Sequence, residues 1–114
     1  GINENFMFLS VLTIGEIHKG IHKLPVSKNR NTLREWVSKD LCQRFENRIL
    51  SVSMEIAGIW GEIQGNAEKK GEKIPVVDSL IAATAIAHAL TVVTGNAVDM
   101  EKTGVPIYNP WEPT

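Results

Sequence analysis

The stretch IPVVDSLIAATAIAHALTVVT, residues 74–94, carries the clearest change from helical to strand-like sequence in this chain. Its apolar start gives way near Asp78 to an alanine-rich segment that runs through Ala89, and this composition predicts a helix. β-Branched residues then fill Thr91–Thr94, the most strand-like tetrapeptide of the sequence. Such a helix leading directly into a strand is typical of α/β proteins.

The same alternation extends toward the N-terminus. Phe6–Leu12 is a continuous apolar run, which predicts a strand buried on both faces. Thr13 follows as a candidate helix cap, with Glu16 three residues later at the capping-box position. Pro25 is expected to end this helix at about Lys23.

Further helices and strands complete the pattern. Apolar residues at helical spacing predict one helix within 27–45 and another within 53–71. Short apolar segments at 48–52 and 105–108 predict two more strands. Strands separated by helices favour an α/β fold with a mostly parallel sheet.

Length and composition set the outer limits. The chain has 114 residues, 43% of them hydrophobic and 22% charged, which is the size and composition of one globular domain. Its net charge of −1 excludes a generically basic nucleic-acid binder, although not a local basic patch. The single cysteine, Cys42, cannot form an intramolecular disulfide and fits a reducing compartment, so we expect a cytoplasmic protein.

Acidic residues fall where strands are expected to end. The only aspartates are Asp40, Asp78 and Asp99. Asp78 lies where an apolar segment gives way to a predicted helix, and Asp99 lies in the loop expected after the strand at 91–94. Glu16 lies near the start of the first predicted helix. Carboxylates gathered at one sheet edge would repel each other without a cation, and oxygen ligands select hard ions such as Mg²⁺ or Mn²⁺. The competing explanation is helix capping, because acids are favoured in a first helical turn whatever the function.

Four segments resemble a known family when they are taken in order along the chain. They are LSVLTIGEI at 9–17, IPVVDSLIAATA at 74–85, TGNAVDM at 94–100 and NPW at 109–111. Together they resemble the PIN-domain nucleases, specifically toxins of the VapC/FitB type. The resemblance implies a PIN-like three-layer α/β/α fold with a mostly parallel sheet over residues 1–114.

The resemblance also implies a function. It indicates a metal-dependent endoribonuclease toxin of a type II toxin–antitoxin system, which hydrolyses RNA phosphodiesters and is neutralised by a cognate antitoxin. Carried over position by position, Glu16, Asp78 and Asp99 become the catalytic, metal-holding acids, with Mg²⁺ or Mn²⁺ as the ion. Thr94 and Asn96 become supporting polar groups beside them.

One expected motif has no match. The family begins with a buried strand that ends in an Asp-x-Asn-like motif, whereas the only acid before Glu16 is Glu4. The pattern therefore predicts a domain truncated at its N-terminus by a strand and a helix, about 30 residues or more. We expect such a chain to be a weak or inactive nuclease and to form a homodimer or strand-swapped oligomer through its exposed strand edges. The alternative is a non-catalytic PIN-like module that binds a protein and whose metal site has decayed.

Basic residues gather in one acid-free segment. No Asp or Glu occurs between Ile17 and Arg34. The same segment holds five basic residues: Lys19, Lys23, Lys28, Arg30 and Arg34. They fit an RNA-contacting patch, an antitoxin-binding surface or an ordinary solvated surface. His18 and His22 have a zinc-compatible spacing on one predicted helix, but a surface or packing role is favoured because further ligands are missing nearby.

Overall fold

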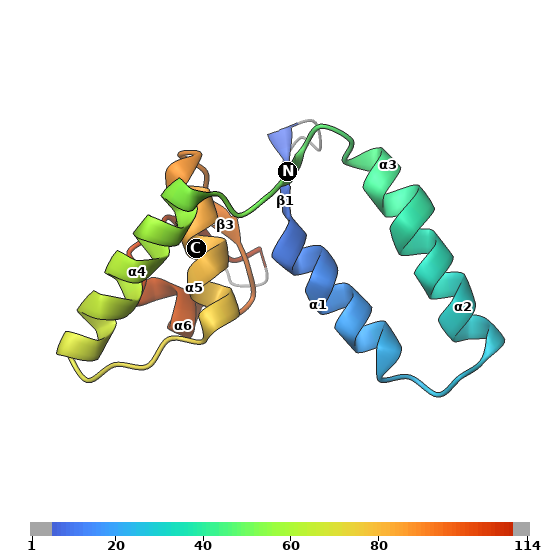
Figure 1. Cartoon of the computed structure of the whole chain (residues 1–114), viewed down its shortest axis with the longest axis horizontal. Helices are drawn as coiled ribbons and strands as arrows, with labels where there is room; N and C mark the ends of the chain where they lie inside the picture. The colour runs from blue at the N-terminus through green and yellow to red at the C-terminus, as the bar shows by residue number, and fades with distance from the viewer. Residues whose placement is uncertain (1–5, 111–114) are drawn as a thin grey trace. The chain divides into compact units, whose positions relative to one another are not determined.

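The computed structural model describes residues 6–110 of the chain. It divides into two compact units, one ending at Ser51 and one beginning at Val52, and each is described by itself (Figure 1). Glu4, the only acid before Glu16, and Trp111 of the NPW segment lie outside the described residues. Within residues 6–110, no helix has the length and apolar character required to cross a membrane.

The first unit is built around two helices that follow one another along the chain. Its elements in order are β1 (Leu9–Ser10), α1 (Val11–His22), α2 (Lys28–Glu35), the π-helix η2 (Trp36–Leu41), α3 (Cys42–Arg44) and β2 (Ile49–Leu50). β1 and β2 pair in parallel, with Leu9 opposite Ile49. The helix predicted within 27–45 is confirmed, with a six-residue π-helical turn in its middle.

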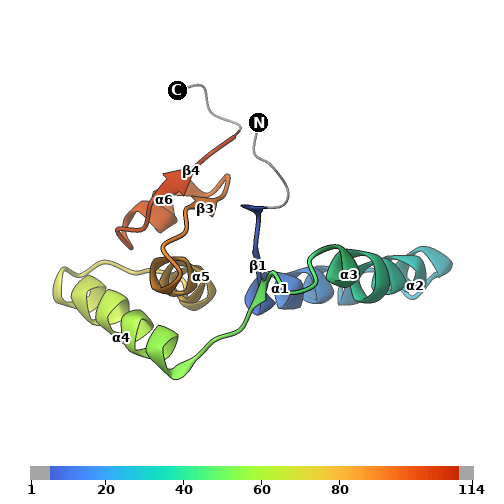
Figure 2. The ribbon, with the colours of Figure 1, turned by 90° about the horizontal axis from the view of Figure 1, so that it is seen from above.

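The second unit has α5 at its centre. Its elements in order are α4 (Met54–Lys69), α5 (Val76–Ala87), β3 (Val92–Val93), α6 (Ala97–Glu101) and β4 (Ile107–Tyr108). Figure 2 shows α5 lying between α4 on one side and the layer of β3, β4 and α6 on the other. β3 and β4 pair in parallel, with Val92 opposite Ile107.

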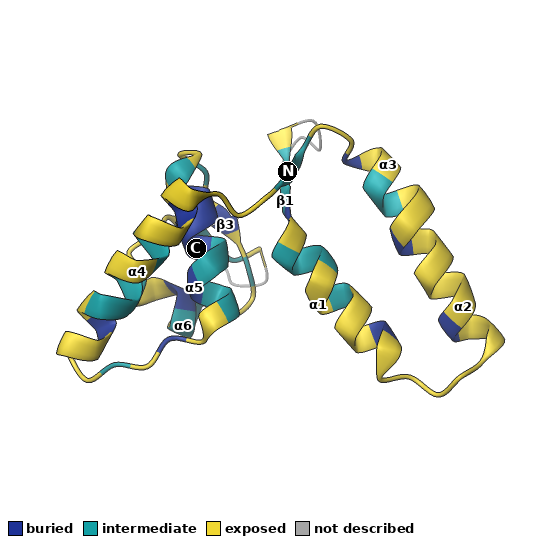
Figure 3. Ribbon diagram, viewed as in Figure 1, coloured by how far each residue is buried: buried dark blue, intermediate teal, exposed yellow. Residues whose placement is uncertain are grey.

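Small residues on α5 make this packing close. Ala82 and Ala85 belong to a buried cluster with Val92, Met100 and Val105, and Ala82 is fully buried. Figure 3 shows buried positions on α5 in dark blue. An alanine side chain ends at Cβ, so α5 can approach the strand layer without a gap. This cluster is the hydrophobic core that holds the second unit together.

Three serines determine where helices begin. The Oγ atoms of Ser10, Ser27 and Ser53 each accept a backbone N–H bond from the first turn of α1, α2 and α4, at 3.1, 3.2 and 3.2 Å. Because Ser10 caps α1, the helix begins at Val11, and only Leu9–Ser10 of the strand predicted over 6–12 is strand. The expected burial on both faces is also wrong, because Phe6 and Phe8 are exposed. A short apolar run does not by itself distinguish a strand from a helix start.

The strands are shorter than the sequence predicted, at two residues each, and they form two separate two-stranded parallel sheets within the described chain. The parallel pairing and the α/β class are confirmed. α4 ends with Gly71 in the left-handed region at φ 70°, in agreement with the predicted end of that helix. α5 ends in the same way, with Ala89 at φ 54°.

Candidate functional site

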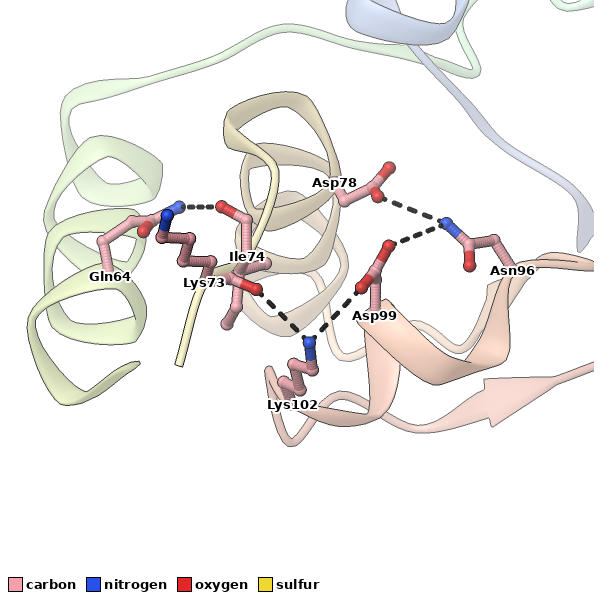
Figure 4. A network of polar contacts seen from close by, with 7 residues as sticks. All are labelled: Gln64, Lys73, Ile74, Asp78, Asn96, Asp99 and Lys102. Atoms are coloured by element: carbon pink, nitrogen blue, oxygen red, sulfur yellow. Dashed lines mark hydrogen bonds and ion pairs between the residues drawn. The ribbon is translucent and has the colours of Figure 1, made fainter. Parts of the chain in front are cut away.

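Two carboxylates of the second unit share one amide group. Asn96 Nδ2 lies 3.5 Å from Asp78 Oδ2 and 3.4 Å from Asp99 Oδ2, so it donates toward both side chains (Figure 4). Asp78 comes from α5 and Asp99 from α6, and both are half-buried. Two like charges thus lie next to a single neutral donor.

Asp78 is positioned by a polar anchor under the start of α5. Its neighbour Ser79 is fully buried, and Ser79 Oγ lies 3.1 Å from the Pro75 carbonyl and 2.8 Å from that of Val76. Gln64 on α4 donates from Nε2 to Ser79 Oγ at 2.7 Å and also to the Ile74 carbonyl at 3.0 Å. These bonds fix the first turn of α5 against α4, and Asp78 is the third residue of that helix.

Asn96 is positioned by the turn between β3 and α6. Its backbone N–H donates to Thr94 Oγ1 at 3.0 Å, and the Thr94 N–H donates to the Tyr108 carbonyl at 3.1 Å at the end of the β3–β4 ladder. Asn96 is the N-cap residue of α6, yet its side chain makes no capping bond. Asparagine is among the best helix caps, so using its amide for the carboxylates is a departure from its usual role.

A lysine supplies countercharge on the far side of Asp99. Lys102 Nζ lies 3.4 Å from Asp99 Oδ1 and 3.3 Å from the Lys73 carbonyl (Figure 4). The side chains of Lys102 and Asp99 are 34% and 32% exposed. The sequence reasoning did not single out Lys102, although its position three residues after Asp99 on a helix was a usable signal.

Asp78 lies in the first turn of α5, at the helix start where it was expected, whereas Asp99 does not lie where it was expected. Asp99 was predicted to lie in a loop, but it is the third residue of α6. Gln64 was also missed, and no local pattern in the sequence marks it, because its partners lie 10 and 15 residues away.

Glu16 lies in the first unit, exposed in the second turn of α1. The predicted Thr13–Glu16 capping box is wrong, because Ser10 caps the helix instead and its first turn contains no acid. Within residues 6–110, no group of three or more His, Cys, Asp or Glu side chains is arranged to hold a metal ion. Glu16 as a third acid of the site therefore stays a prediction.

The basic segment divides into exposed and buried residues. Lys19, Lys23, Lys28 and Arg34 are exposed, whereas Arg30 is only 8% exposed. Arg30 is therefore not the free surface residue that a solvated patch would require.

His22, the last residue of α1, contacts two arginines of this segment. Its Nδ1 accepts from Arg30 Nη2 at 2.8 Å and lies 3.3 Å from Arg34 Nη2. Because Nδ1 already accepts from an arginine, this nitrogen is not available to a zinc ion, in agreement with the surface or packing role favoured for His22.

The sequence also matches a known family. The model of the family described as PIN domain matches residues 2–105 of the chain. This chain belongs to the PIN-domain family. The resemblance inferred from the sequence segments is thereby confirmed.

Relatives of this chain are named as a plasmid stability protein, a toxin and a ribonuclease. "Plasmid stability protein StbB" of Pseudomonas syringae pv. tomato is 35% identical, over 93% of this chain and 76% of that protein. "Toxin FitB" of Neisseria gonorrhoeae is 33% identical over 92% and 76%. "VapC ribonuclease Y4jK" of Sinorhizobium fredii is 29% identical over 94% and 76%.

The fold agrees with that of a solved PIN-domain relative. The crystal structure of FitAcB from Neisseria gonorrhoeae matches with a TM-score of 0.92 and 31% identity, over 98% of this chain and 81% of that one. The PIN-like α/β fold is thus confirmed, in a helix-rich form with short parallel strands.

Proposed function

We propose that this PIN-domain chain is a divalent-metal-dependent endoribonuclease of the toxin type, which hydrolyses RNA phosphodiesters. The observation that carries the proposal is the shared amide of Asn96, because it holds the carboxylates of Asp78 and Asp99 side by side. The similarity to proteins named as a toxin and as a VapC ribonuclease supports the same chemistry.

The donor atoms of this pair fit a hard divalent cation. Two carboxylates offer only oxygen ligands, and they are half-buried, where their mutual repulsion is less screened than in open solvent. Asp78 and Asp99 would hold Mg²⁺ or Mn²⁺, and we propose Glu16 as the third acid. When bound, such an ion stabilises negative charge on phosphate oxygens and activates water for hydrolysis.

The remaining residues of the site act on the carboxylates. Asn96 orients the two facing oxygens, and Thr94 fixes the turn that carries Asn96. Lys102 offsets the charge of Asp99 from the other side. With two acids held together in the second unit, we expect the chain alone to cleave RNA weakly.

We further propose a cognate antitoxin protein as the partner that restrains this activity in the cytoplasm. We also propose a homodimer or strand-swapped oligomer. The two-residue ladders β1–β2 and β3–β4 support it, because each leaves unpaired strand edges within the described residues, and such edges recruit other chains.

The test is RNA cleavage with and without metal. Slow cleavage is expected with Mn²⁺ or Mg²⁺ and none with EDTA, and Asp78→Asn should lower the rate by about a hundredfold or more, because it removes a charged ligand. Asp40→Asn is the matched control, since Asp40 is exposed on η2 in the other unit. Cleavage that persists in EDTA or in Asp78→Asn would contradict the proposal. A chain that neither cleaves RNA nor binds Mn²⁺ would favour the non-catalytic, protein-binding alternative.

A further inference from the structure

Two arginines of α2 converge on one neutral side chain at the end of α1. Arg30 and Arg34 are one helical turn apart, and both direct Nη2 at His22 Nδ1, at 2.8 and 3.3 Å. The loop that joins α1 to α2 lies beside them, at the lower right of Figure 1. A single nitrogen lone pair is thus shared by two guanidinium groups.

This arrangement leaves positive charge without compensation. Neither arginine forms an ion pair with a carboxylate anywhere in residues 6–110. Arg30 is 8% exposed, and its Nε is buried with no hydrogen-bond partner among the described residues. Buried cationic donors are costly when they lack a partner, and each guanidinium presents a planar fork that matches an oxyanion. The cluster is therefore built to receive an anion.

The surrounding charge favours a polyanion over a single carboxylate. Lys19 and Lys23 lie in and just after the last turn of α1, and Lys28 opens α2, so three exposed lysines flank the arginines. No acid occurs from Ile17 to Arg34 to interrupt them. Several exposed cations close in sequence to a guanidinium pair suit a phosphodiester backbone, in which successive charges follow at short intervals.

We propose that Arg30 and Arg34, held in place by His22, bind a backbone phosphate of the RNA substrate. This inference rests on the proposed function, since it assigns an RNA-binding site to the same protein. It differs from a general basic patch, because it assigns the binding to one buried and one exposed guanidinium that are both directed at His22 Nδ1. An acidic protein segment and free inorganic phosphate are the competing ligands that the experiment must separate.

The experiment measures RNA binding without cleavage. The full chain carrying Asp78→Asn is titrated into a fluorescently labelled single-stranded RNA in EDTA, and anisotropy gives the dissociation constant over a series of KCl concentrations. Adding Arg30→Gln and Arg34→Gln should weaken binding about tenfold and reduce the salt slope by about 0.7, the amount expected for one lost phosphate contact on a single strand. Lys69→Gln with Lys70→Gln is the control, because it removes two exposed charges at the end of α4.

A single variant keeps the inference testable if the double variant fails to fold. Arg34 is exposed, so Arg34→Gln alone should fold, as circular dichroism can check, and should still reduce affinity and slope. Arg34→Lys keeps the charge but removes the fork, and it should restore only part of the affinity. Unchanged RNA affinity in Arg34→Gln would overturn the inference.

Competition identifies the ligand. Inorganic phosphate should displace RNA only at far higher concentration than unlabelled RNA does, and poly-glutamate should compete poorly. Equal competition by poly-glutamate, or phosphate binding that is lost in Arg34→Gln while RNA binding is kept, would overturn the RNA assignment. Because binding is measured without metal, Arg-dependent RNA binding with no cleavage would refute the proposed nuclease alone. Cleavage with Arg-independent binding would refute this inference alone.

Discussion

The acidic cluster of the second unit and the basic cluster of the first are built on the same plan with opposite charge. In one, Asp78 and Asp99 share the amide of Asn96, and in the other, Arg30 and Arg34 share the imidazole of His22. Each pair of like charges thus has one neutral side chain between its members.

The two clusters differ in how short their hydrogen bonds to the shared group are and in whether an opposite charge lies nearby. The amide–carboxylate distances are 3.4 and 3.5 Å, at the long limit for a hydrogen bond, and Lys102 adds countercharge to Asp99. The shorter imidazole bond is 2.8 Å, and it reaches a buried arginine that has no acidic partner in the described chain. The acids are loosely held, partly neutralised and accessible to a cation, whereas the buried Arg30 is tightly held and depends on its acceptor.

The largest effect should come from removing one acid and measuring metal-dependent stability. In native chain, Mn²⁺ at about one hundred times its dissociation constant should raise the free energy of unfolding by about 2.7 kcal/mol. Asp99→Asn should abolish most of that gain, because it leaves Asp78 as the only carboxylate at Asn96. Urea unfolding with and without Mn²⁺ gives both values. Asp40→Asn should keep the full gain, and an equal loss in that control would show that the metal binds elsewhere.

A smaller effect is expected when the imidazole is removed from the basic cluster. His22→Leu should lower the free energy of unfolding by about 1–2 kcal/mol, because it leaves the buried Arg30 without its acceptor. Urea unfolding in the absence of added anions measures the change. His18→Leu is the matched control, since His18 is an exposed histidine one turn earlier on α1. Equal effects of the two substitutions would show that the His22 bonds contribute nothing.

Removing the shared amide from the acidic cluster should lower the free energy of unfolding by less. Asn96→Ala removes an exposed amide whose two bonds are long, so we expect a loss of about 0.5 kcal/mol in EDTA. Thermal unfolding of this variant beside His22→Leu tests the ranking directly. A larger loss for Asn96→Ala than for His22→Leu would reverse the comparison between the clusters.

The sequence predicted the helices better than the strands. Apolar residues at helical spacing within 27–45 and 53–71 marked α2 and α4, because helical periodicity is a local property. The strand prediction for Phe6–Leu12 was largely wrong, because successive apolar residues suit a buried strand and a helix start alike. The Ser10 hydroxyl caps α1 and so makes the end of this run helical.

The sequence predicted the residues of the acidic cluster, because they belong to short motifs that can be read locally. Asp78, Asn96 and Asp99 carry a family pattern, and the structure brings them together. The burial of Arg30 and its bond to His22 depend on how two helices pack, and no spacing within either helix reveals that contact.

The smallest effect should come from Lys102, and its sign is informative. Lys102 Nζ lies 3.4 Å from Asp99 Oδ1. In the absence of metal, its ammonium group therefore neutralises part of the negative charge that would attract a divalent cation. Lys102→Met should therefore tighten Mn²⁺ binding by about twofold, which corresponds to an exposed ion pair on a helix of about 0.4 kcal/mol. Lys73→Met is the control, because Lys73 contributes its backbone carbonyl to this network. Isothermal titration with Mn²⁺ measures both, and weaker binding in Lys102→Met would mean that the lysine organises Asp99 for the metal rather than competing with it.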